Sequence, residues 1–335
     1  MNPAALSDDG LAMVTLCSRL VAAANGGEPI KPLTTTEWNG LAVRLAASPW
    51  ERPRGLLGRT EEELRATLDL DGSMAVRFAR LLDRAGLVSL EVERLANRGI
   101  WATTRMDEGF PPKWKARLGS QAPPVLFGAG AASLLDREGA AVVGSRDVDA
   151  VGAEFAEEVG RRCAGAGVLV VSGGARGVDR LAIGGALAAE GEGVAVLADS
   201  LDRLARGAEN RRFVADGRLT LVSPFHPGAG FQVGNAMARN KLIYCLADVA
   251  VVIASSHKTG GTWHGAIENL RQGWVPLFVR DGETAPDGNR VLIAEGGIAL
   301  PALPDERDLL VWFRDRAAAT PRQEQSAAQL ALLTD

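Results

Sequence analysis

The chain of 335 residues is long enough for one large domain and a smaller one, and its composition, 47% hydrophobic and 23% charged, is ordinary for a globular protein. A net charge of −4 gives no overall basic signature, so any nucleic acid would have to be bound by a local patch. Three widely spaced cysteines argue against a disulfide framework, and without a signal peptide or an apolar span of about 18 residues we expect a cytoplasmic protein with no membrane partner.

Residues 1–98 carry helical periodicity and predict a small all-helical N-terminal module. Thr60, with Glu63 three residues later, is a capping-box signature for one of its helices. Further helices are expected at 11–24, 36–47, 74–85 and 89–97. The module suits an interaction or packing role, and a helix-hairpin-helix-like contact with DNA is the alternative.

Residues 99–137 are proline-rich and resemble a linker that leads into the next domain. Lys113, Lys115 and Arg117 lie close to Trp114 in this segment. Basic residues interleaved with an aromatic residue can form a nucleic-acid patch, or they can be a solvated edge. Both interpretations stay open at this point.

Residues 138–304 alternate between short apolar runs and helical patterns. Strands are expected at 140–143, 168–171, 194–197, 219–222, 249–253 and 275–279. Nearly continuous apolar strands are typical of a sheet covered on both faces, and intervening helices favour right-handed βαβ units. The segment therefore predicts a Rossmann-like, doubly wound, mostly parallel α/β sheet. Residues 305–335 predict a C-terminal helix and a polar tail.

A glycine turn, Ser172-Gly173-Gly174-Ala175-Arg176-Gly177, lies between one of these strands and the helix that begins at Val178. A strand, a glycine turn and a helix N-terminus together form an anion site, because the backbone can approach closely and the first N–H groups lack partners. Arg176 adds a positive charge. We expect a phosphate there, either free or within a nucleotide or polynucleotide.

Small, basic and amide residues also follow the other strands. Gly144, Ser145 and Arg146 follow the first strand, and Asp199, with Asn210 beyond it, follows the third. Further along the chain come Arg239-Asn240-Lys241 and Thr259-Gly260-Gly261-Thr262. Since ligands bind beyond the carboxyl ends of parallel strands, these residues predict a phosphate-binding edge of the sheet.

Catalytic and metal signatures are weak. The turn reads GGxxG instead of the dinucleotide pattern GxGxxG, although Asp199 stands where a ribose-binding acid could lie. His257, His264 and Glu268 lack the further ligand that a metal site would need. Asp179 suits a dipole partner in a first helical turn as well as a catalytic acid. Nothing in these residues compels an enzyme or a metal site, and nucleotide binding stays open.

Four ordered motifs carry a resemblance to a known family. They are AVVGSRDV at 141–148, VVSGGARGVDRLAIGGAL at 170–187, VAVLADSLD at 194–202 and ARNKLI at 238–243. Over roughly 99–300 the sequence resembles the DNA-processing protein A (DprA/Smf) family. That resemblance implies a protein with no catalytic residue, no metal and no cofactor, which binds single-stranded DNA, helps to load a RecA-type recombinase and acts as a homodimer.

Carried over by motif, the DNA pocket is lined by Gly144, Ser145, Arg146, Ser172, Gly173, Arg176, Gly177, Asp179, Arg239, Asn240 and Lys241. Gly174 and the loop Thr259, Gly260, Gly261 and Thr262 complete the predicted phosphate-binding set. Backbone N–H groups at 173–177 would hold one phosphate, while Arg146, Arg239 and Lys241 would neutralise neighbouring ones.

The sequence departs from the family at one position that matters for binding. Family members carry Phe-Pro before the Arg-Asn pair, where this chain has Ala236-Met237. An aromatic residue there would stack a base, and Phe231 or Trp263 is our hypothesis for a substitute. The chain resembles a divergent branch, with roles in natural transformation and in phage defence both open.

Two other functions remain as alternatives. Gly260-Gly261-Thr262 with Glu268 resembles the glycine motif and catalytic acid of LOG-type nucleotide phosphoribohydrolases, with the spacing about one residue different. That resemblance would make the chain an enzyme that releases a base from a nucleoside monophosphate. A nucleotide-sensing module that signals to a partner is the other alternative.

Overall fold

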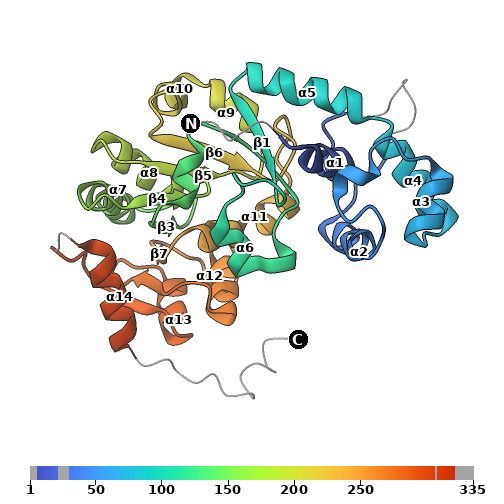
Figure 1. Cartoon of the computed structure of the whole chain (residues 1–335). Helices are drawn as coiled ribbons and strands as arrows, with labels where there is room; N and C mark the ends of the chain where they lie inside the picture. Colours follow the sequence, from blue (N-terminus) through green and yellow to red (C-terminus); the bar gives the residue numbers. More distant parts are fainter. Residues whose placement is uncertain (1–5, 22–29, 306–307, 321–335) are drawn as a thin grey trace, which may run out of the picture.

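The computed structural model describes residues 6–21, 30–305 and 308–320, which form a nine-stranded sheet flanked by helices and joined to a helical module (Figure 1). The strands are β1 (Ile100–Thr104), β2 (Val125–Ala129), β3 (Gly139–Val143), β4 (Leu169–Ser172), β5 (Gly193–Val196), β6 (Leu219–Ser223), β7 (Val249–Val252), β8 (Leu277–Arg280) and β9 (Ile298–Leu300). The α-helices are α1 (Asp8–Cys17), α2 (Thr35–Ala46), α3 (Glu61–Leu68), α4 (Gly72–Leu82), α5 (Ala85–Asn97), α6 (Pro112–Leu118), α7 (Ala150–Gly165), α8 (Val178–Ala188), α9 (Leu201–Arg206), α10 (Ala208–Ala215), α11 (Val233–Leu246), α12 (Gly260–Gln272), α13 (Asp287–Ala294) and α14 (Leu309–Ala319). No helix among these residues is long and apolar enough to cross a membrane.

The strand order in the sheet is β1-β2-β6-β5-β4-β3-β7-β8-β9. β1 pairs antiparallel with β2, and β2 pairs antiparallel with β6, whereas every pairing from β6 to β9 is parallel. All six strands expected from the apolar runs are present. The prediction of a Rossmann-like, doubly wound, mostly parallel sheet is therefore confirmed.

The strand order reverses between β3 and β7. From β3 the chain adds β4, β5 and β6 in one direction, and it then returns through α11 to add β7, β8 and β9 on the other side. β3 and β7 pair in parallel register, with Val143 opposite Val252 near their carboxyl ends. In open α/β sheets this reversal opens a crevice beyond the strand ends, and ligands bind there.

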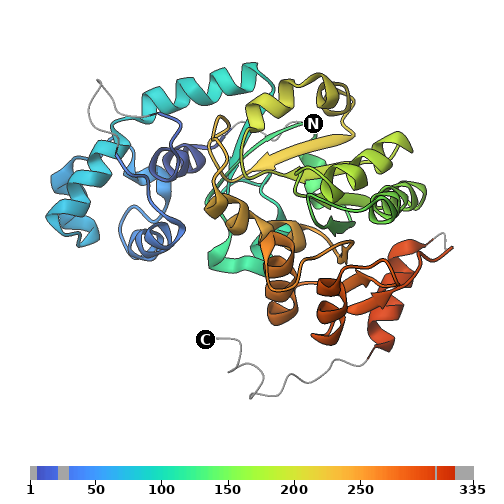
Figure 2. The same cartoon turned by 180° about the vertical axis from the view of Figure 1, so that it is seen from behind.

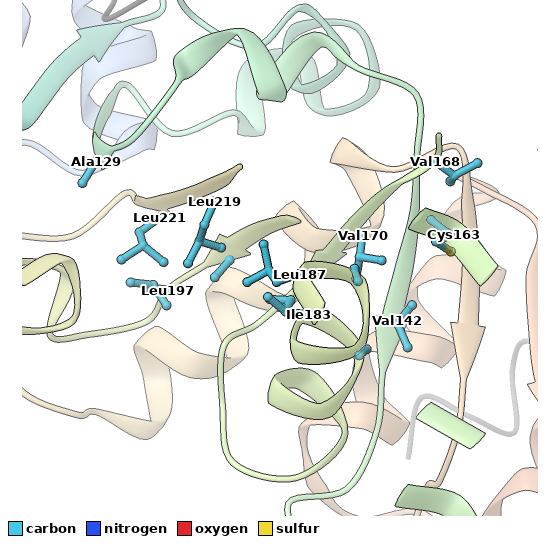
Figure 3. Packing of buried hydrophobic residues seen from close by; sticks show 14 of the residues in the cluster. Ala129, Val142, Cys163, Val168, Val170, Ile183, Leu187, Leu197, Leu219 and Leu221 are labelled. Atoms are coloured by element: carbon cyan, nitrogen blue, oxygen red, sulfur yellow. The ribbon is translucent and has the colours of Figure 1, made fainter. Parts of the chain in front are cut away.

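Apolar side chains on both faces of the sheet explain why its strands are nearly continuous apolar runs. Val142 and Val170 belong to a buried cluster that includes residues of α7 and α8, part of which appears in Figure 3. Val143 and Val171 point to the opposite side, into a second cluster with residues of α11 and α12. Successive side chains of a strand alternate between faces, so each strand contributes to both layers. Figures 1 and 2 show helices on the two sides of the sheet.

The N-terminal module has its own apolar core, which includes Met13, Trp38 and Phe78. The capping box predicted at Thr60 and Glu63 is confirmed at the start of α3. The first helix begins at Asp8 and ends at Cys17, earlier than the predicted 11–24, because the backbone of the next residue is extended. Residues 22–24 of that prediction lie outside the described residues.

The linker interpretation of residues 99–137 is wrong at the level of secondary structure. This segment contains β1, α6 and β2, and β2 joins the parallel strands through β6. Pro112 is the first residue of α6, a position that tolerates proline because the first N–H of a helix has no partner. The short strand β9 was not predicted either. The division of the chain into domains at residue 98 stays a prediction, and so does the tail at 321–335, which lies outside the described residues.

An ion pair in the N-terminal module makes part of the free energy of unfolding depend on pH. Arg77 donates two hydrogen bonds to the Glu37 carboxylate, at 2.7 and 3.2 Å. These bonds lower the pKa of Glu37 from 4.5 to about 2. Since the folded-state pKa is the lower one, the stabilisation is present above about pH 4.5 and is lost as the pH falls toward 2.

We expect Glu37→Gln to lower the free energy of unfolding by about 1 kcal/mol at pH 7, because it removes a charge-assisted pair that is only partly buried. Urea unfolding at pH 7 and at pH 3 measures the effect. The difference in the free energy of unfolding between variant and wild type should be less than half as large at pH 3 as at pH 7. Glu62→Gln, at an exposed position of α3, is the control. A difference that is unchanged at pH 3 contradicts this account.

Candidate functional site

Two adjoining cavities lie at the carboxyl ends of the central strands. The first has a volume of about 460 Å³ and lies at the strand-order reversal, between the loops after β3 and β7 and helices α11 and α12; we call it the switch-point cavity. The second, of about 250 Å³, lies beyond β4 and β5, and we call it the arginine cavity. Arg146, Ala175, Phe231 and Arg239 line both cavities and so form the partition between them.

Thirteen of the sixteen predicted site residues line at least one of these cavities. Those in the switch-point cavity are Gly144, Ser145, Arg146, Asp179, Arg239, Asn240, Thr259, Gly260, Gly261 and Thr262. Those added by the arginine cavity are Gly173, Gly174 and Arg176. The fold thus brings together residues from four separate segments of the chain, as the strand-end argument predicted.

The glycine turn after β4 packs tightly against its neighbours. A Cβ at Gly177 would lie 2.5 Å from the carbonyl oxygens of Ser145 and Arg146, and the φ of Gly177 is +82°. A Cβ at Gly173 would overlap the guanidinium group of Arg239. Only glycine permits this backbone conformation and this close approach. The turn is therefore held against the loop after β3 and against α11.

Two side chains of opposite charge, Asp179 and Arg239, are buried behind the glycine turn. Asp179, in the first turn of α8, accepts a hydrogen bond from the backbone N–H of Ala175 at 3.2 Å, and burial raises the pKa of its carboxyl, a shift that the charge of Arg239 opposes. Arg239 is 6% exposed, and burial lowers the pKa of its guanidinium while Asp179 opposes that shift. Arg239 places a positive charge in the wall of both cavities.

Two polar atoms near this pair are buried without a partner. In the described part of the chain, the Arg239 Nε and Tyr244 Oη atoms make no hydrogen bond, and both residues line the switch-point cavity. Leaving a buried donor unsatisfied costs about 1–3 kcal/mol. A ligand that carries acceptor oxygens, such as a phosphate, would satisfy such donors.

An exposed aromatic ring and a cation form the rim of the partition. The guanidinium carbon of Arg146 lies 5.1 Å from the centroid of the Phe231 ring, and Phe231 is 53% exposed. Trp263, the other hypothetical substitute for the family's aromatic residue, is 7% exposed and makes an edge contact with His257. Of these two candidates, Phe231 is the one whose ring is available for stacking.

The arginine cavity is strongly positive, although the chain as a whole is acidic. Five arginines and one carboxylate line it, namely Arg146, Arg176, Arg180, Arg203, Arg239 and Asp199. Arg176 also pairs with Asp147 at 2.7 Å, but both side chains are well exposed and such a pair contributes little. Sequence reasoning missed Arg180 and Arg203, whose signal was their place in the first turns of helices that follow parallel strands.

The N-terminus of α12 closes the switch-point cavity on the far side. Thr259 is its N-cap and makes no side-chain capping bond, while Gly260 has a φ of +81°. The Asn240 Nδ2 group donates to the Gly261 carbonyl at 2.9 Å and so holds α11 against this end of α12. First-turn N–H groups and the helix dipole favour an anion here.

Three predicted residues do not line either cavity. Lys241 lines a separate cavity beside the N-terminal module, and its ammonium group lies 3.3 Å from Gln121 Oε1. Consecutive helical residues point about 100° apart, so Lys241 cannot share the direction of Asn240. Ser172 is buried and donates to the Val142 carbonyl at 2.5 Å, and Gly177 is packed against the loop after β3.

The basic segment at 113–117 stabilises the fold instead of offering an aromatic nucleic-acid patch. Trp114 is fully buried and donates its indole N–H to the Leu242 carbonyl at 2.8 Å. Lys113 pairs with Asp248 at 2.7 Å, and Arg117 donates to the Cys245 carbonyl at 3.0 Å. These contacts attach α6 to the C-terminal end of α11.

His257, His264 and Glu268, which were weighed for metal and hydrolase chemistry, line neither cavity. Glu268, the acid of the phosphoribohydrolase alternative, lines neither the switch-point nor the arginine cavity. Within residues 6–21, 30–305 and 308–320, no group of three histidine, cysteine or acidic side chains is arranged to hold a metal ion.

Comparison with known proteins assigns the family. The profile of the family described as DNA recombination-mediator protein A matches residues 101–305, more than half of the chain. The chain belongs to this family. It is 32% identical over 195 residues to the putative DNA processing protein DprA of Mycobacterium tuberculosis H37Rv, with 54% of this chain and 49% of that protein covered. It is 31% identical over 196 residues to DprA of Streptococcus pneumoniae R6, with 57% and 67% covered. The chain thus spans about half the length of the mycobacterial relative.

Solved DprA structures share the fold. The DprA structure from Streptococcus pneumoniae matches with a TM-score of 0.56 and 21% identity, over 83% of this chain and 98% of that one. The structure of DNA processing protein A from Helicobacter pylori matches with a TM-score of 0.51 and 22% identity, over 64% of this chain and 94% of that one, and that protein has a unique single-stranded DNA binding mode. The fold and the family assignment therefore agree.

The close packing of Gly173 predicts a destabilising variant. We expect Gly173→Ala to lower the free energy of unfolding by about 1–3 kcal/mol, because the new methyl group overlaps Arg239 and crowds Asp179. Urea unfolding measures this loss. Gly184→Ala in α8, where a Cβ meets no atom within 4 Å, is the matched control and should be neutral or stabilising. In an Arg239→Ala background the cost of Gly173→Ala should shrink, and an equal cost in both backgrounds would show that Arg239 is not the obstacle.

Proposed function

We propose that the chain binds single-stranded DNA across the switch-point and arginine cavities, without catalysis and without a cofactor. The observation that carries the proposal is the partition between the cavities. There the buried Arg239, whose Nε has no hydrogen-bond partner among the described residues, adjoins the exposed Arg146, which is stacked on the exposed ring of Phe231. Family membership supports the same function.

Phosphate groups would supply most of the affinity. The arginines of the second cavity and the buried guanidinium of Arg239 neutralise backbone phosphates and release counterions. The N–H groups of the first turn of α12 add donors that carry no sequence preference, whereas the Ala175 N–H of the glycine turn already donates to Asp179. Binding of this kind depends on salt and tolerates any base sequence.

Stacking would favour a single strand over a duplex. The Phe231 ring is exposed between the two cavities, just before α11, and Val233 and Met237 are exposed apolar side chains of α11 itself. An unpaired base can lie on such a surface, whereas a duplex keeps its bases stacked inside and offers no face to the ring.

The partners that we propose rest on the family description. The description of the family as recombination mediators supports a role in which the bound strand is passed to a RecA-type recombinase. A homodimer and a cytoplasmic location are proposed with it. The measurement that bears on these partners is recombinase loading on strands that the protein has already bound.

The first test is fluorescence anisotropy of labelled oligothymidylate in series of length and salt concentration. We expect binding that strengthens with length and weakens steeply with salt. Arg146→Ala and Arg239→Ala should each weaken binding and reduce the slope of log K against log salt by about 0.7, the value for one phosphate contact on a single strand.

The control for these variants is Arg161→Ala, at an exposed arginine of α7 whose ion pairs in the described part of the chain are with Glu157 and Glu158 of its own helix. It should bind as the wild type does. Because Arg239 is buried, the melting temperature of its variant is measured beside its affinity. No binding by the wild type, even at low salt, would overturn the proposed function.

The stacking role of Phe231 has a separate test. We expect Phe231→Ala to weaken oligothymidylate binding by about 1–3 kcal/mol, the value of one base stacked on an aromatic ring, with the salt slope unchanged. Phe231→Trp keeps a ring and should restore the affinity. Equal affinities of the alanine and tryptophan variants would show that no base lies on this side chain.

A further inference from the structure

A third cavity, of about 190 Å³, lies on the other side of the arginine cavity, and we call it the apolar cavity. Its walls include Ile183 and Leu187 of α8, Leu197 and Leu221 from the strand layer, and Phe213 of α10. Figure 3 shows the first four of these side chains in one layer of packed residues beside the sheet. The cavity therefore interrupts the apolar layer between α8 and strands β5 and β6.

The apolar cavity adjoins the arginine cavity. Gly174, Arg180, Leu197 and Leu204 line both of them. A ligand can therefore place a charged group among the arginines and an apolar group in the neighbouring space. The combination of the two cavities calls for a molecule with an anionic part and a compact apolar part.

The mouth of the apolar cavity is open to solvent. Gly184 lies there on the exposed side of α8, and a Cβ at this position would meet no atom within 4 Å. The next residue, Gly185, is different, since a Cβ there would overlap the backbone of Glu157 on α7. Packing thus requires glycine at 185 but not at 184, where glycine is unfavourable for a helix and leaves the mouth open.

Size and polarity narrow the apolar group to a single ring system. The volume is below the roughly 300–1,000 Å³ of pockets that hold a whole drug-sized ligand. The walls are mostly aliphatic and aromatic, and Glu209 and Asn210 are polar residues of the lining, with the Asn210 Nδ2 group donating to the Leu204 carbonyl at 3.1 Å. A flat ring with polar edges, attached to a phosphate, is the chemistry of a nucleotide.

We propose that the apolar cavity holds a nucleobase whose phosphate lies in the arginine cavity, near Arg180 and Arg203. The base belongs either to the DNA strand, in which case the inference rests on the proposed function, or to a free mononucleotide, which offers the same chemistry. The site is distinct from the Phe231 surface, because Phe231 does not line the apolar cavity.

The test closes the mouth of the apolar cavity and leaves the arginines in place. Gly184→Leu introduces a side chain there, and Gly184→Gln is a second variant with similar reach that suits an exposed helix. Gly40→Leu is the matched control, since Gly40 is also a helical glycine whose Cβ would meet nothing within 4 Å, in α2 of the N-terminal module. Melting temperatures establish that each variant is folded.

Three kinds of probe separate the possible outcomes. They are oligothymidylate, an abasic oligonucleotide of equal length, and the four nucleoside monophosphates, each tested separately. If the base comes from the strand, both Gly184 variants should bind oligothymidylate at least fivefold more weakly, bind the abasic strand as the wild type does, and leave the Gly40→Leu control unchanged. If the base comes from a free nucleotide, the same loss should appear with a monophosphate that the wild type binds.

Failure of the two proposals can be told apart. If the wild type binds oligothymidylate and no monophosphate, and folded Gly184 variants keep the wild-type affinity and the wild-type preference over the abasic strand, the nucleobase site is overturned and DNA binding stands. If the wild type does not bind oligothymidylate, the proposed function fails. Binding of the nucleoside monophosphates then tests the nucleobase site by itself. Saturable binding that the Gly184 variants lose supports the nucleobase site, and no binding overturns it.

Discussion

The buried guanidinium of Arg239 is the feature on which the site is built. A charge taken out of water is stable only when an opposite charge and donors or acceptors accompany it, and Asp179 supplies that charge from the first turn of α8. The guanidinium lies against Gly173, where any side chain would collide with it. One constraint therefore ties α11, the glycine turn and α8 together and fixes the partition between two cavities.

The topology concentrates positive charge in an acidic protein. Parallel strands all end at one edge of the sheet, so residues that follow β3, β4 and β5 meet there with residues of α11. On the outer helices, arginines such as Arg162 are instead paired with carboxylates such as Glu158. The field that a polyanion meets is thus local, and it acts over about a Debye length and not over the whole surface.

The three cavities along this edge differ in the chemistry that they offer. One has helix N-termini and a buried cation, the next has exposed arginines, and the third has apolar walls. Because neighbouring cavities share lining residues, a flexible chain of alternating phosphates and bases can use all three at once. α11 also separates this edge from the N-terminal module, since Lys241 on its other side faces a cavity that Thr34 and Thr35 line.

The sequence by itself determined the six parallel strands, the capping box at Thr60 and Glu63, and the glycine turn. The spacing of apolar residues, the capping of a helix and the backbone freedom of glycine all act over a few residues, so a local pattern contains them. Only the tertiary structure decided that residues 99–137 add two strands, since pairing with β6 joins segments almost a hundred residues apart. It also decided that Phe231 is the exposed aromatic residue and that Lys241 points away from the cavities. Side-chain direction and long-range pairing depend on how whole elements pack, and no local pattern contains that information.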